Sequence, residues 1–126
     1  MRQKELRIAL ICYGGVSLAV YMHGVTKEVW KLARASRAFC AGEERPLGVE
    51  GAYHDLLQRI AEREGVRLRV LTDIVTGASA GWINAVFLAQ ALHSGHSLEP
   101  LTELWLEPAA APRSWNSAKA SAPRDR

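Results

Sequence analysis

Residues Gly77, Ala78, Ser79, Ala80 and Gly81 form a G-x-S-x-G pattern, in which a serine can act as a nucleophile. Such a serine stands on a sharp turn between a strand and a helix, and its neighbours must be small because the two elements approach closely there. Backbone N–H groups at the start of the following helix would favour a developing oxyanion. A turn that only packs a helix on a strand would need the same small residues, so the pattern alone leaves both interpretations open.

The flanking segments favour the catalytic interpretation of this turn. Residues 70–76 are rich in apolar and β-branched side chains, which is typical of a buried strand. From Ala80 onward, apolar residues recur with helical spacing at Ile83, Val86, Phe87 and Ala91. The sequence therefore predicts a strand, a sharp turn and a helix, which is the context of a nucleophile elbow.

A second turn, Gly14-Gly15, follows another predicted strand at residues 6–13 and precedes a predicted helix at residues 16–35. The apolar face predicted for this helix consists of Leu18, Tyr21, Val25, Val29, Leu32 and Ala33. Two glycines before a helix leave N–H groups available to an anion. The dinucleotide and P-loop patterns are both absent. An oxyanion loop, a simple tight turn and, with less support, an anion or nucleotide site remain as interpretations.

The other elements complete an α/β pattern. We expect a loop over residues 36–51, a helix over residues 52–64 that stops at Gly65, and an elbow helix that ends near residues 93–95. A last helix, capped by Ser97, is expected to run to about Glu107. The β-α-α-β-α order predicts a parallel sheet with helices on both faces. The Ala-, Pro-, Ser- and Arg-rich residues 108–126 are expected to form a disordered or aberrant tail.

Composition excludes several classes of function. The 126 residues carry a net charge of +3 and 48% hydrophobic residues, which suits one small domain. No basic stripe with interleaved aromatic residues supports nucleic-acid binding. Cys12 and Cys40 lack metal-ligand spacing, and Cys12 is expected to be a buried small hydrophobe. No signal peptide or apolar stretch of about 20 residues is visible, so a cytoplasmic location is expected.

Two motifs in this order resemble the N-terminal part of a bacterial patatin-like phospholipase. The resemblance covers residues 5–107 and rests on residues 14–25, on Thr76 to Gly81 with Ile83-Asn84-Ala85, and on residues 101–107. It implies a lipid acyl hydrolase with a serine–aspartate dyad and no cofactor or metal. Ser79 would be the nucleophile, and Gly14 and Gly15 would lie in the oxyanion loop. A lipid or phospholipid would be the substrate, with peripheral membrane contact.

The sequence departs from that family's pattern at several positions. Val16-Ser17-Leu18 replaces a longer glycine run, and Trp82 stands where a second glycine is common, so its indole would either crowd the helix–strand contact or line the acyl cleft. The dyad aspartate has no counterpart. Asp73 precedes Ser79 by six residues and is about 20 Å away at ~3.3 Å per residue.

The other two aspartates do not supply the dyad either. Asp55 begins a separate predicted helix, and Asp125 lies in the predicted tail. The four histidines, His23, His54, His93 and His96, have no evident aspartate to orient them. We therefore expect a fragment that is truncated or whose reading frame is lost after Glu107. The alternative function is a catalytically inactive fragment or an acyl-binding module.

Overall fold

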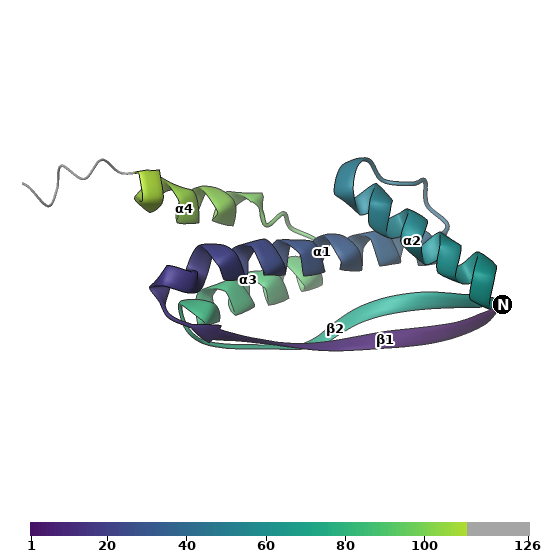
Figure 1. The fold of residues 1–126 in the computed structure, drawn as a ribbon, viewed down its shortest axis with the longest axis horizontal. Helices are drawn as coiled ribbons and strands as arrows, with labels where there is room; N and C mark the ends of the chain where they lie inside the picture. The colour runs from purple at the N-terminus through teal and green to yellow at the C-terminus, as the bar shows by residue number, and fades with distance from the viewer. Residues whose placement is uncertain (111–126) are drawn as a thin grey trace, which may run out of the picture.

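A computed structural model describes the backbone of residues 1–110 and the side chains of residues 1–107. Two strands and four α-helices form a mixed α/β unit (Figure 1), which confirms the fold class at that level. The elements are β1 (Arg2–Gly14), the 3₁₀ turn η1 (Val16–Leu18), α1 (Ala19–Ala41), α2 (Gly48–Glu64), β2 (Val66–Ser79), α3 (Ala80–Ser94) and α4 (Glu99–Ala110).

The two strands pair in parallel along almost their whole lengths. Arg2 lies opposite Val66 at one end, and Gly14 lies opposite Ser79 at the other. The register shifts once, where Ile8 pairs with Thr72 and Ala9 with Ile74. The shift skips Asp73, and the pairing then continues to Gly14 and Ser79, so both strands end at the same level. The carboxyl ends of parallel strands meet at one edge, and here that edge carries both glycine-containing turns.

The described helices lie on one face of the sheet (Figure 1), so the prediction of helices on both faces is wrong for residues 1–110. On the covered face, Cys12 and Val70 are buried. On the other face, Ile11, Tyr13 and Ile74 remain 70%, 82% and 58% exposed. The reason is topological: α1 and α2 both belong to the single crossover between the strands, and α3 contacts both strands as well.

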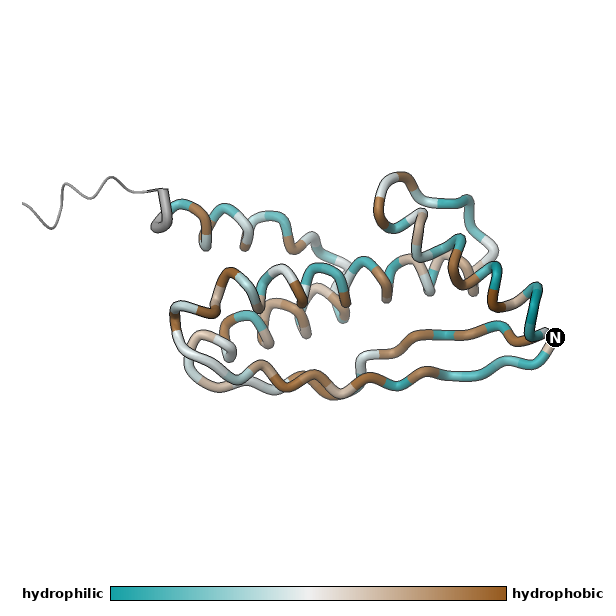
Figure 2. The backbone as a smooth tube through the Cα atoms, in the orientation of Figure 1, coloured by the Kyte–Doolittle hydropathy of each residue, from teal (hydrophilic) through white to brown (hydrophobic). Residues whose placement is uncertain are grey.

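Two small apolar clusters form the core between the helices and the sheet. Under the turns, the buried residues Cys12, Ala19, Met22, Ala80 and Ala85 pack together. Further along, the cluster contains Trp30, Leu88, Ala91 and Leu98. The tube in Figure 2 changes from hydrophilic to hydrophobic along β1, away from the N-terminus. The core therefore supports the carboxyl end of the sheet, where the candidate site lies.

The loop expected over residues 36–51 is largely helical. Helix α1 continues to Ala41 and ends at Gly42 with a left-handed φ of 72°, and α2 begins at Gly48. Ser36 is buried in α1, where its Oγ accepts a hydrogen bond of 2.8 Å from the backbone N–H of Val70. This contact with β2 explains why a polar residue that is common in loops stands inside a helix.

The apolar face predicted for the first helix is also partly wrong. Leu18, Tyr21 and Val25 are 48%, 73% and 39% exposed, whereas the face that packs on the rest of the molecule combines small, polar and large apolar residues. Buried in the first half of α1 are Ala19, Met22, His23, Thr26 and Trp30. Residues 16–18 form a 3₁₀ turn rather than the first turn of the α-helix. The exposed residues instead lie beside β1, as described below.

Several predicted helix ends are confirmed. Gly65 and Gly95 have left-handed φ values of 64° and 74° and end α2 and α3. The Ser97 Oγ accepts a hydrogen bond of 3.1 Å from the Glu99 N–H, as a cap of α4 should. Helix α4 runs to Ala110, so the first three residues of the expected tail are helical. The rest of that tail lies outside the described residues.

Candidate active site

Ser79 has a strained backbone conformation. Its φ of 56° and ψ of −134° make it the only non-glycine residue with a positive φ in residues 1–110. Such a conformation costs on the order of 1–3 kcal/mol and persists where the surrounding structure enforces it, commonly at functional sites. Ser79 is also exposed, at the junction of β2 and α3. The residue with the strained backbone is therefore also one that a substrate can reach.

The two glycines of the motif are required by close backbone contacts. A Cβ atom on Gly77 would overlap the carbonyl oxygen of Gly81, and a Cβ atom on Gly81 would overlap the carbonyl oxygen of Cys12 in β1. Neither neighbour is the end of a flexible side chain, so the backbone itself would have to move. Ala80 is buried, whereas Ala78 is exposed. The G-x-S-x-G pattern thus matches the space that the strand–helix junction leaves.

The register of the sheet brings the second glycine turn to Ser79. Gly14 is the Cα partner of Ser79 at the last position of the strand pair. Gly15, which follows it, is exposed and has an extended conformation at the start of η1. Its carbonyl accepts a hydrogen bond of 3.0 Å from the Leu18 N–H. The two turns predicted to hold the nucleophile and the oxyanion loop therefore lie side by side.

Asn84 connects the elements behind these turns, a role that its place in the motif did not reveal. It is fully buried in α3, its Nδ2 donates to the carbonyl of Ala19 at 3.1 Å, and its Oδ1 accepts from Trp105 Nε1 at 3.2 Å. Asn84 thereby links α3 to the first residue of α1 and to α4. The signal available in the sequence is a polar residue within the apolar first part of the helix, residues 80–89.

No carboxylate of residues 1–107 is hydrogen-bonded to Ser79, and the described aspartates are paired with arginines. Asp55 forms a two-bond ion pair with Arg45, at 2.6 and 2.8 Å, which lowers the pKa of Asp55. Asp73 pairs with Arg7 at 3.2 Å, and Asp125 lies outside the described residues. Among residues 1–107 there is also no group of three or more potential metal ligands. The described part of the chain thus holds the serine without the carboxylate of a dyad.

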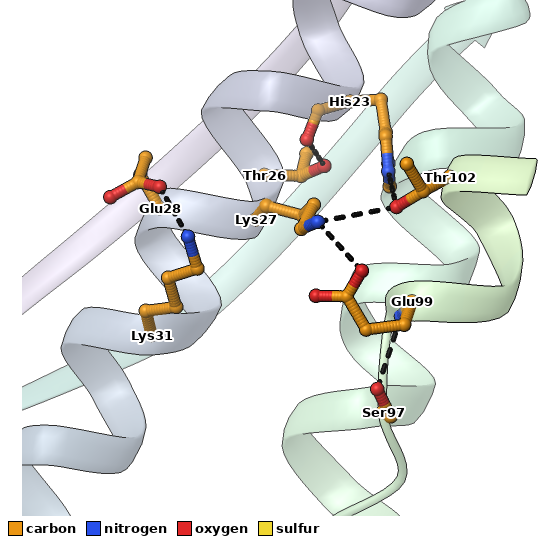
Figure 3. Close-up of polar contacts among 8 residues, drawn as sticks. All are labelled: His23, Thr26, Lys27, Glu28, Lys31, Ser97, Glu99 and Thr102. Carbon is orange, nitrogen blue, oxygen red and sulfur yellow. Dashed lines mark hydrogen bonds and ion pairs between the residues drawn. The ribbon is translucent and has the colours of Figure 1, made fainter. Parts of the chain in front are cut away.

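The histidines do not supply a base for Ser79 either. His23 is buried in α1, and its Nε2 lies 2.8 Å from the Thr102 Oγ1 of α4 (Figure 3). Burial lowers the pKa of His23, Lys27 lowers it further, and Glu99 opposes the change. His54 is buried against the Phe39 ring. His93 and His96 are exposed near the far end of α3 from Ser79.

An apolar hollow of about 340 Å³ lies between the end of β1 and α1. Its lining includes exposed Ile11, Tyr13, Leu18 and Tyr21, together with buried Met22. Tyr13 immediately precedes Gly14, so the hollow adjoins the glycine turn. Its volume falls at the low end of the range for small-molecule sites, about 300–1,000 Å³. This hollow provides apolar surface next to the candidate nucleophile.

The structure also shows how exposed two further side chains near the turns are. Trp82 is 59% exposed, and it is not among the residues that line the apolar hollow. Cys12 is 5% exposed, which confirms that it is a buried small hydrophobe, and burial raises the pKa of its thiol. A thiol with a raised pKa is a poor nucleophile, so Cys12 does not compete with Ser79 as the candidate nucleophile.

Comparisons with known proteins give one similarity. The chain is 35% identical, over 116 aligned residues, to an uncharacterized membrane protein of Mycobacterium tuberculosis. The alignment covers 82% of this chain and 10% of that protein, so the chain spans about a tenth of its relative's length. No family model and no solved structure matches the chain. In residues 1–110, each helix is too short or too polar to cross a bilayer.

Proposed function

We propose that this chain carries the nucleophile half of a patatin-like acyl hydrolase, with Ser79 as the nucleophile. The observation that carries the proposal is the strained, exposed Ser79 on a strand–helix turn whose sheet partner is Gly14. The resemblance of both turns to those of patatin-like phospholipases supports the same interpretation. In this proposal the two described strands belong to a larger parallel sheet of that fold.

The proposed reaction is acyl transfer through the serine oxygen. The Ser79 Oγ attacks the carbonyl carbon of an ester, and the carbonyl oxygen becomes an oxyanion that the N–H groups of Gly14 and Gly15 would stabilise. The serine proton passes to a base and then to the departing alcohol. Water next hydrolyses the acyl-enzyme and releases the carboxylic acid. In a patatin-like dyad the base is an aspartate, which the described residues do not provide.

The apolar hollow is the observation that favours an ester with a long acyl chain as the substrate. Its lining is exposed although it is apolar, and it adjoins Gly14, so burial of an acyl chain there would remove that surface from water. A lipid or phospholipid meets this requirement. The chain would then contact a membrane peripherally, from the cytoplasm, with the edge of the sheet that carries the two turns.

A fluorophosphonate probe tests the proposal, because it reacts covalently with an activated serine. We expect the purified chain to be labelled, labelling to disappear in Ser79→Ala, and labelling to persist in Ser94→Ala. Ser94 is an exposed serine at the other end of α3, which makes it a matched control. Absence of labelling in the native chain, or equal labelling of Ser79→Ala, would contradict the proposal.

A second candidate function is acyl binding without turnover. It is favoured by the ion-paired positions of Asp55 and Asp73, which leave Ser79 without a carboxylate in the described residues. We expect the chain to hydrolyse p-nitrophenyl esters little or not at all, even where the probe labels Ser79. Ester turnover that is lost in Ser79→Ala would show that the chain is active by itself and would remove this second candidate.

A further inference from the structure

A basic hollow lies at the end of the sheet opposite to Ser79. It has a volume of about 590 Å³, and cations from three elements line it: Lys4 of β1, Arg37 of α1, and Arg67 and Arg69 of β2. Lys4 is ten residues before Gly14 along β1, which places the hollow about 30 Å from the candidate active site at ~3.3 Å per residue. The two sites are therefore separate.

The cations of this hollow are not neutralised by carboxylates in the described residues. None of the four forms an ion pair with an Asp or Glu of residues 1–107. The single acidic residue of the lining, Glu5, is bound by Arg7 at 3.0 Å, and Arg7 also contacts Asp73. An excess of positive charge inside a concave surface concentrates the electrostatic field and attracts anions.

Two of the guanidinium groups are held in place by contacts of their own. Arg37 donates a hydrogen bond of 3.3 Å to the Leu92 carbonyl, and the Arg67 guanidinium lies 5.8 Å from the centre of the Phe39 ring. The Arg67 Nε is buried without a hydrogen-bond partner among the described residues. A buried donor normally has a partner. Arg67 therefore combines a fixed position with unused hydrogen-bonding capacity.

We propose that this hollow binds a small phosphorylated anion with at least two negative charges. Guanidinium groups present planar pairs of donors that match phosphate oxygens, and three of the four cations here are arginines. The volume lies within the range of small-molecule sites. The cations converge on a hollow from three elements instead of spreading along one exposed face, which favours a small ligand over a membrane surface or a nucleic acid.

Titration calorimetry with inorganic pyrophosphate at fixed ionic strength tests this site. Lys4 and Arg69 are exposed, so the double variant Lys4→Gln/Arg69→Gln is expected to fold, which far-UV circular dichroism checks. We expect the native chain to bind pyrophosphate and this variant to bind at least about tenfold more weakly, a loss typical of removed charge-assisted contacts. The variant Arg59→Gln/Arg63→Gln removes the same charge from exposed positions of α2 and should bind as the native chain does.

Three results would overturn the proposal. The first is an absence of pyrophosphate binding by the native chain. The second is an equal loss of affinity in both double variants, which would indicate a general effect of net charge. The third is binding of phosphatidylglycerol vesicles, but not of pyrophosphate, that is lost only in Lys4→Gln/Arg69→Gln. That result would assign the hollow to an anionic membrane surface.

Discussion

The two ends of the sheet differ in almost every physical property. At the carboxyl end, small residues allow close backbone contacts, Ser79 is strained, and apolar side chains line the adjoining hollow. At the amino end, β1 is hydrophilic (Figure 2), and arginines and a lysine surround the basic hollow. Substitutions at the carboxyl end should therefore act through sterics and strain, whereas those at the amino end should act through charge. The pyrophosphate titration of Lys4→Gln/Arg69→Gln tests the amino end, and the variants described next test the carboxyl end and the helices that pack on it.

The largest effect is expected at Gly81. In Gly81→Ala the new Cβ would overlap the Cys12 carbonyl oxygen, so β1 and α3 would have to separate. We expect the free energy of unfolding to fall by about 3 kcal/mol, the upper end of the usual cost of overpacking. Urea denaturation measures the change. Gly24→Ala is the control, because that helical glycine has open space around it and should become more stable by ~0.5–1 kcal/mol. Similar values for the two variants would contradict the account of the junction.

Asn84→Leu should have the next largest effect. The substitution leaves the Ala19 carbonyl and the Trp105 indole N–H without their partner in a buried region. We expect a loss of about 2–3 kcal/mol in the free energy of unfolding, in line with the cost of unsatisfied buried groups. Gln90→Leu, an exposed position on the same helix, should change stability by less than about 0.5 kcal/mol. Thermal denaturation of both variants measures the difference. A loss at Asn84 no larger than that at Gln90 would show that the hydrogen bonds of Asn84 are dispensable for stability.

A smaller gain in stability is expected when the strain at Ser79 is removed. Glycine adopts a positive φ without steric cost, whereas alanine does not. Ser79→Gly should therefore be more stable than Ser79→Ala by about 1 kcal/mol. Comparing these two variants cancels the loss of the hydroxyl group, which both share. Equal stability in urea would show that the turn relaxes and that the backbone of Ser79 stores no strain.

The smallest effect concerns pH and His23, which is buried in the second turn of α1. Burial lowers its pKa in the folded chain, so the unfolded chain binds the proton more readily. This contribution to stability is present above the ordinary histidine pKa of about 6.5 and is lost as the pH falls through the folded value. Between pH 7.5 and 5.5, His23→Gln should lose less stability than the native chain. A steeper loss in the variant would contradict this sign.

Local signals in the sequence predicted the type and order of the elements of the site, although both strands are longer than the predicted 6–13 and 70–76. Each of these signals depends on neighbouring residues only. They are the run of β-branched residues before Gly77, the small residues around Ser79, and the glycines Gly65 and Gly95 that end helices. The close backbone contacts of Gly77 and Gly81 are the physical reason for the pattern. Whether Ser79 is catalytic stays a prediction that the labelling experiment tests.

Features that depend on distant contacts could not be predicted. The alignment of Gly14 with Ser79 follows from the sheet register and its shift near Ile8, neither of which has a local signal. Ser36 is helical because it binds the backbone of Val70, 34 residues later. The sequence misassigns the apolar face of α1 because helical spacing alone does not show that the face with Met22 and Thr26, and not the face with Tyr21, packs on the rest of the molecule.

The most direct test of the central claim is to locate a covalent adduct on the native chain. After brief treatment with a fluorophosphonate, the chain would be digested and its peptides analysed by mass spectrometry. The account predicts one adduct, on Ser79, formed before any adduct on the exposed serines Ser94 and Ser97. An adduct spread evenly over these serines, or no adduct on Ser79, would show that the strained turn does not create a nucleophile.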